Sequence, residues 1–61
     1  MFIGKERYGF FQIRYFIKID NTTTYYYDKY FFVRAVIKVQ KELGLTALDE
    51  FRIACKVNTI I

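Results

Sequence analysis

Six residues in this 61-residue chain, numbers 41–46 (KELGLT), predict the end of one helix and the start of another. Gly44 lacks a Cβ and can adopt the left-handed conformation that ends a helix. The Thr46 hydroxyl can accept a hydrogen bond from the free N–H groups of the next helix, and Asp49 adds negative charge to its first turn. The chain is therefore expected to contain two helices joined by a very short turn.

The first of these helices is expected to start after an N-cap at Asp28. Apolar residues recur at helical spacing along it, at Phe32, Val36, Val39 and Leu43. Further apolar neighbours widen that face, and the clearly polar ridge consists of Arg34, Lys38 and Lys41. A helix with so wide an apolar face is predicted to be largely buried.

The second helix is predicted to lie on the surface with one apolar side. Its apolar stripe consists of Leu48, Phe51, Ala54 and Cys55, and the opposite side carries Asp49, Arg52 and Lys56. This places Cys55 as a buried structural thiol in preference to a reactive one. The helix pair spans residues 28–58, and residues 57–61 are expected to add an edge strand or to fray.

Residues 1–27 are predicted to form the β part of the molecule. Between residues 10 and 20 the odd positions are apolar, while polar residues dominate the even positions, which is the pattern of a half-buried strand. The turn residues Asp20 and Asn21 then lead into a run of threonines and tyrosines, so a hairpin is expected. A two-residue loop would pair Ile17 with Thr24, and a three-residue loop would pair it with Tyr25.

The fold class that follows is α+β, with one domain over residues 1–61. An N-terminal β-hairpin precedes two α-helices in a helix–turn–helix arrangement, and Met1, Phe2 and Ile3 are a candidate third strand at the edge of the sheet. The composition is 54% hydrophobic and 21% aromatic. Because a chain of this length buries only about 60% of its unfolded surface, the apolar excess predicts a homodimer.

The cellular setting is inferred from what the chain lacks. One cysteine cannot form an internal disulfide, and the N-terminus has charges where a signal peptide would be apolar. No apolar run reaches the roughly 18 residues that span a bilayer. The expected protein is therefore cytoplasmic, without membrane insertion.

The chemistry of the chain argues against catalysis. It has no histidine and no serine, which excludes serine triads, Cys–His pairs and histidine metal sites within one chain. The carboxylates are scattered over turns and helix starts, and the three glycines are too far apart for a phosphate-binding loop. We expect no enzyme activity, no cofactor and no metal.

Binding remains, and the formal net charge of +4 is compatible with nucleic acid. Two groups could make the contact. The strand group consists of Gln12, Arg14, Phe16 and Lys18, and the helix group consists of Arg34, Lys38 and Lys41. We expect a small, basic, dimeric regulator that binds nucleic acid. The alternative is a protein-binding module, an inhibitor of the phage or mobile-element type, which holds a host protein through an aromatic surface.

Overall fold

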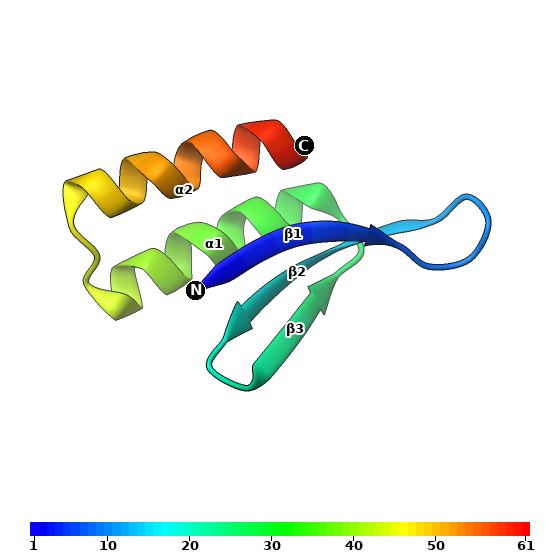
Figure 1. Cartoon of the computed structure of the whole chain (residues 1–61), viewed down its shortest axis with the longest axis horizontal. Helices are drawn as coiled ribbons and strands as arrows, with labels where there is room; N and C mark the ends of the chain where they lie inside the picture. Colours follow the sequence, from blue (N-terminus) through cyan, green and yellow to red (C-terminus); the bar gives the residue numbers. More distant parts are fainter.

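The computed structural model describes all 61 residues and contains a three-stranded sheet followed by two helices (Figure 1). The elements are β1 (Phe2–Arg7), β2 (Ile13–Ile19), β3 (Thr22–Tyr26), α1 (Lys29–Leu43) and α2 (Ala47–Ile60). The sheet is antiparallel with the strand order β1-β2-β3. The α+β class is confirmed, and the N-terminal strand is the third strand at one edge. Neither helix has the length and apolarity needed to cross a membrane.

The β2–β3 hairpin has the register of the two-residue loop. Ile17 lies opposite Thr24, and Asp20 and Asn21 connect the strands. Asp20 has a φ of 54°, a left-handed value that aspartate tolerates better than most residues. The three-residue alternative, with Ile17 opposite Tyr25, is therefore wrong.

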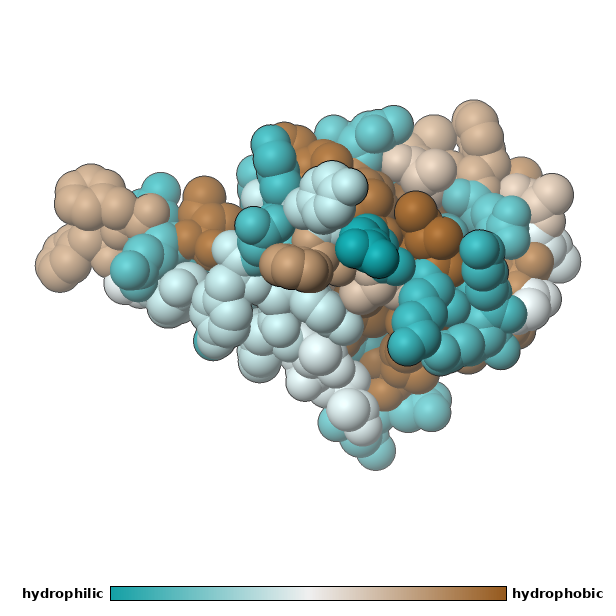
Figure 2. All heavy atoms as spheres, turned by 180° about the vertical axis from the view of Figure 1, so that it is seen from behind, coloured by the Kyte–Doolittle hydropathy of each residue, from teal (hydrophilic) through white to brown (hydrophobic).

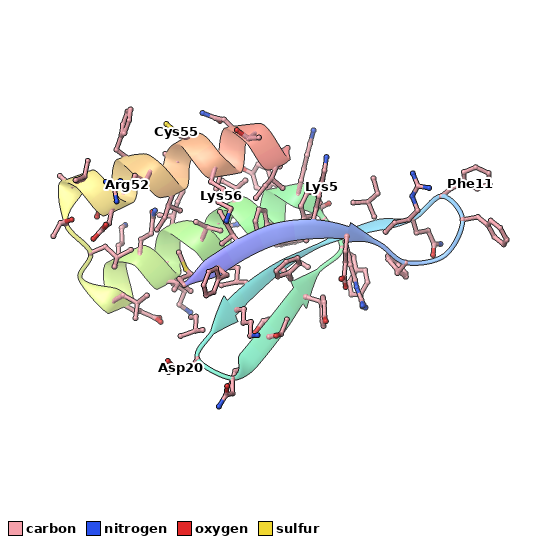
Figure 3. The ribbon with its side chains drawn as sticks, in the orientation of Figure 1. Lys5, Phe11, Asp20, Arg52, Cys55 and Lys56 are labelled. Atoms are coloured by element: carbon pink, nitrogen blue, oxygen red, sulfur yellow. The ribbon has the colours of Figure 1, made fainter.

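The loop between β1 and β2 differs from the expectation for the first long strand. Strand β2 begins at Ile13, because residues 8–12 turn the chain so that Arg7 can lie opposite Ile13. The turn is closed by the Tyr8 N–H, which donates to the Gln12 carbonyl at 3.0 Å. Phe11, which matched the alternating pattern, is 96% exposed and lies at the far end of this loop (Figure 3).

The caps predicted around the helices are present. Asp28 accepts a hydrogen bond from the Tyr30 N–H at 2.7 Å, and Thr46 accepts one from the Asp49 N–H at 3.3 Å. Gly44 ends α1 with a φ of 62°. Its N–H donates to the Lys41 carbonyl, and the next N–H donates to the Gln40 carbonyl, which together form a Schellman motif.

One small core joins the sheet to both helices. Its six members are Ile3, Ile17, Phe32, Val36, Val57 and Ile60. Helix α1 packs over β2 and β3, and α2 packs over β1. Phe32 is fully buried, and its ring stacks on Tyr15 with the centroids 5.0 Å apart.

Helix α1 is less buried than its sequence indicates. Phe32 and Val36 are its buried residues, whereas Phe31, Ile37 and Leu43 are 62%, 47% and 46% exposed. The sheet covers one side of α1, and α2 lies beside another side, where a hollow of 210 Å³ remains between the two helices. The rest of the wide apolar face is open.

Helix α2 faces the core with a different side from the one predicted. Val57 and Ile60 are buried, while Phe51 is 67% exposed and Cys55 is exposed. Cys55 lies on the side of α2 away from α1 (Figure 3). The predictions of a buried Leu48–Cys55 stripe and a buried thiol are wrong. Residues 57–60 continue the helix, so the expected edge strand there is wrong as well.

Candidate nucleic-acid interface

The strand group predicted from sequence is only partly assembled. Arg14, Phe16 and Lys18 share the face of β2 opposite to Ile17, which is the face that the helices leave open. Gln12 precedes β2 and belongs to the β1–β2 loop. On β1 the residues opposite these three are Glu6, Gly4 and Phe2.

The Arg14 guanidinium is already in contact with other side chains of the same chain. Its Nε donates to Glu6 Oε1 at 2.7 Å, and a terminal nitrogen lies 2.6 Å from the same oxygen. The guanidinium carbon lies 3.9 Å from the centre of the Tyr25 ring and 5.3 Å from that of Tyr8. The hydrogen bond to Glu6 raises the pKa of Arg14 above its ordinary value. This guanidinium therefore has part of its charge and its ring-facing surface already engaged.

Phe16 is also fixed against the sheet. A Cβ on Gly4 would lie 2.7 Å from the Phe16 Cζ atom, so the ring occupies the space that the missing side chain leaves. Tyr25 lies opposite Phe16 on the other neighbouring strand, and Phe2 is 67% exposed at the edge. Lys18 is the cation of this face that makes no ion pair.

The helix group is brought together by α1. Arg34, Lys38 and Lys41 are all exposed and, with Ile37, line a hollow of 330 Å³. With a rise of about 1.5 Å per residue, Arg34 and Lys38 are about 6 Å apart along the helix axis. No hydrogen bond or ion pair engages any of the three cations. We refer to Arg34, Lys38 and Lys41 as the basic ridge.

The basic ridge differs from the other cations in its electrostatic surroundings. Two more hollows contain cations, and each also contains a carboxylate: Asp49 beside Arg52, and Glu6 beside Lys5 and Arg7. The hollow of the basic ridge has no acidic lining residue. Figure 2, which views the molecule from behind, shows hydrophilic groups separated by apolar surface. Among the three hollows that contain cations, the one at the ridge is thus the one without a carboxylate, although Glu42 follows Lys41 on the same helix.

The two predicted groups lie on opposite sides of the molecule. Arg34 and Lys38 each follow a buried residue, Phe32 and Val36, by two positions, which is a rotation of about 200° around the helix. The basic ridge therefore points away from the sheet, whereas Arg14 and Lys18 lie on the sheet's far face. One phosphate backbone cannot contact both faces without wrapping around the protein.

Sequence reasoning missed three features of these surfaces. Ile37 lines the same hollow as the ridge cations. Helical spacing already places Ile37 beside Arg34 and Lys38, so this neighbour could have been found from the sequence. Tyr25 lies over Arg14 because the two-residue loop places it opposite Phe16. The pairing between Glu6 and Arg14 depends on the length of the β1–β2 loop, for which the sequence carries no clear signal.

Comparison with protein-family models, with curated proteins and with solved structures found no match. No group of three or more His, Cys, Asp or Glu side chains lies close enough to hold a metal ion. The chemistry that the surface offers consists of unpaired cations on α1 and exposed aromatic rings on the sheet and the β1–β2 loop.

Proposed function

We propose that this protein is a small non-enzymatic regulator that binds nucleic acid, with the basic ridge of α1 against the phosphates of a duplex. The observation that carries the proposal is the hollow lined by Arg34, Lys38 and Lys41 without a carboxylate or an ion-pair partner. Cations without partners lose no internal contact when they bind a phosphate. Arg14 is less suited to this role because Glu6 would have to be displaced.

The expected contact is with the backbone and is independent of sequence. The Arg34 guanidinium can form two parallel hydrogen bonds to one phosphate, and the two lysines contribute point charges. Each neutralised phosphate releases counterions, which drives binding and makes it sensitive to salt. Three such contacts per chain support non-specific affinity, in the range of about 10⁻⁴ to 10⁻⁶ M at physiological salt.

The ridge can be tested by changing Arg34, Lys38 and Lys41 together to alanine. We expect this variant to bind a fluorescent 20-base-pair DNA duplex at least about tenfold more weakly than the wild type in 50 mM salt, measured by anisotropy. Folding should be unchanged, because all three side chains are exposed.

The matched control changes Lys5, Lys18 and Lys29 to alanine, which also lowers the formal charge from +4 to +1 (4 − 3 = 1). These three lysines are exposed but belong to different surfaces. We expect the control to retain most of the affinity. Equal losses in the two variants would show that net charge alone governs binding, and a wild type that binds no duplex at low salt would overturn the proposed function.

A second candidate function is supported by the β1–β2 loop. Phe10 and Phe11 are 90% and 96% exposed, with ring centroids 6.5 Å apart, and they project from the molecule without packing against it. Exposed aromatic rings are typical anchors for a protein partner. On this alternative, the protein inhibits a host protein that holds the loop.

The two candidates respond to different variants. If the loop binds a host protein, changing Phe10 and Phe11 to serine should abolish salt-resistant retention of that protein from a host extract. The basic-ridge variant should then retain it. If the basic ridge binds a duplex, the basic-ridge variant should lose duplex binding and the Phe10 and Phe11 variant should keep it.

We also propose that the functional form is a homodimer. The core contains six residues of 61, while large hydrophobic side chains such as Phe2, Phe31 and Phe51 are more than 60% exposed. A second copy would cover part of this apolar surface.

A further inference from the structure

The two edges of the sheet differ in how they are protected against pairing with another strand. Edge strands in monomers commonly carry charged residues, prolines or bulges that prevent such pairing. Strand β1 carries Lys5, Glu6 and Arg7 and is packed against α2. Strand β3 has the sequence TTTYY, without a charge or proline, and in Figure 1 nothing lies beyond it.

The free backbone groups of β3 can be assigned from its register. In an antiparallel pair, bonded positions alternate with positions whose N–H and C=O groups point away from the neighbouring strand. A two-residue loop is closed by a bonded pair, which here is Ile19 with Thr22. The groups that point outward from β3 therefore belong to Thr23 and Tyr25.

A hollow of 240 Å³ lies at the same edge, between the hairpin and α1. Four of its seven lining residues are apolar, namely Ile17, Ile19, Tyr26 and Val39, and the other three are Asp20, Thr22 and Thr24. Ile19 and Val39 are only half-buried, so the hollow leaves apolar side chains incompletely covered. The edge thus offers both a row of backbone groups and unfilled apolar space beneath it.

We propose that β3 pairs antiparallel with β3 of a second copy of this chain, which joins the two sheets into one of six strands. This assignment rests on the proposed homodimer and names its surface. With the two-fold axis at Thr24, Thr23 bonds to Tyr25 of the partner subunit, and each Thr24 faces its own copy. No charge meets a like charge along this pairing, because Thr22–Tyr26 has none.

The position of α1 is compatible with a two-fold axis at Thr24. Strands in a sheet are about 4.8 Å apart, and α1 packs over both β2 and β3. Two copies of α1 would then run about 10 Å apart, which is an ordinary distance for packed helices. The sides of α1 that meet carry Phe31, Ala35 and Glu42, and Lys38 lies at the outer border of this contact, where its long side chain can still reach solvent. Helix contact is needed, since a stable dimer buries about 800 Å² per subunit and one short strand contributes less.

The test is sedimentation equilibrium of three proteins at micromolar concentration. The wild type should have twice the 7.4 kDa monomer mass. Thr23→Pro removes an outward N–H and leaves the β2–β3 hydrogen bonds in place, so its dimer dissociation constant should rise at least about tenfold. Thr23→Ala keeps the N–H and should dimerise like the wild type.

Each result decides a separate claim. A folded Thr23→Pro protein that dimerises like the wild type would overturn the β3 interface, and loss of the dimer in Phe51→Glu instead would move it to α2. A monomeric wild type would overturn the homodimer itself and leave duplex binding by the basic ridge to be judged separately. If circular dichroism shows that the proline variant is unfolded, Thr24→Lys gives the same readout by placing two lysines opposite each other. A folded Thr24→Lys protein with wild-type dimerisation would also overturn the proposal.

Discussion

Gly44 has a backbone conformation that few other residues adopt without strain. Its φ of 62° lies in the left-handed region, and no heavy atom outside Gly44 and its two chain neighbours lies within 4 Å of the position that a Cβ would take. The cost of a side chain there is therefore conformational and does not come from a clash. We expect Gly44→Val to lower the free energy of unfolding by about 1–3 kcal/mol, measured by urea denaturation.

The control for this change is Gly44→Asn. Asparagine tolerates the left-handed region better than a β-branched residue, so its cost should be clearly smaller. Equal stabilities of the valine variant and the wild type would contradict the assignment of Gly44 as the residue that ends α1.

Gly4 is required for a different reason, which is the space above it. The Phe16 ring lies where a Cβ at this position would be, with 2.7 Å between the two. We expect Gly4→Ala to destabilise the protein by about 1 kcal/mol, because the ring must move. In a Phe16→Ala background the same change should cost much less, and a thermal-unfolding cycle over the four proteins measures the difference. Additive effects would show that the ring does not depend on Gly4.

At the scale of the element, α2 contains two apolar stripes and only one can face the core. The structure selects Val57 and Ile60, which are both 8% exposed, over Phe51 and Cys55. We expect Val57→Ala to cost about 1–3 kcal/mol of unfolding free energy, and Cys55→Ala to change it by less than about 0.5 kcal/mol. The opposite order, measured under conditions where the protein has the same oligomeric state, would restore the stripe predicted from sequence.

The parts of the fold that follow from local rules could be predicted from the sequence. Asp28, Gly44 and Thr46 mark the helix ends through contacts with residues at most four positions away. The β2–β3 turn is equally local, and its two-residue loop was one of two registers that the sequence allowed.

What could not be predicted depends on how elements meet. Helical periodicity does not show which side of α2 packs against β1. The stripe of Leu48, Phe51, Ala54 and Cys55 was therefore predicted to be buried in place of Val57 and Ile60. Alternation alone could not show that Phe11 belongs to a loop, because the end of β2 is set by where β1 pairs with it.

In the candidate site, too, the local features could be predicted and the contacts between elements could not. The basic ridge could be predicted, since Arg34, Lys38 and Lys41 share a helix face whatever surrounds it. The role of Arg14 could not, because its partners Glu6 and Tyr25 come from two other strands.

At the scale of the whole molecule, the proposed self-association would reinforce the proposed nucleic-acid binding. Pairing at β3 would set two basic ridges on the same side of one six-stranded sheet, because α1 lies on the same face of β3 in both copies. Six cations would then be available to one duplex. A dimer in which both ridges contact the same duplex would show about twice the salt dependence of a single chain.

The salt dependence of duplex binding tests the central claim most directly. For B-DNA the slope of log K against log salt is about −0.9 per neutralised phosphate, so the three cations of one ridge account for about −2.7. We predict that replacing Arg34, Lys38 and Lys41 with alanine reduces the magnitude of the wild-type slope by at least that amount, while replacing Lys5, Lys18 and Lys29 leaves most of it. A slope that is unchanged in the first variant would contradict the account, because the basic ridge would then make no phosphate contact.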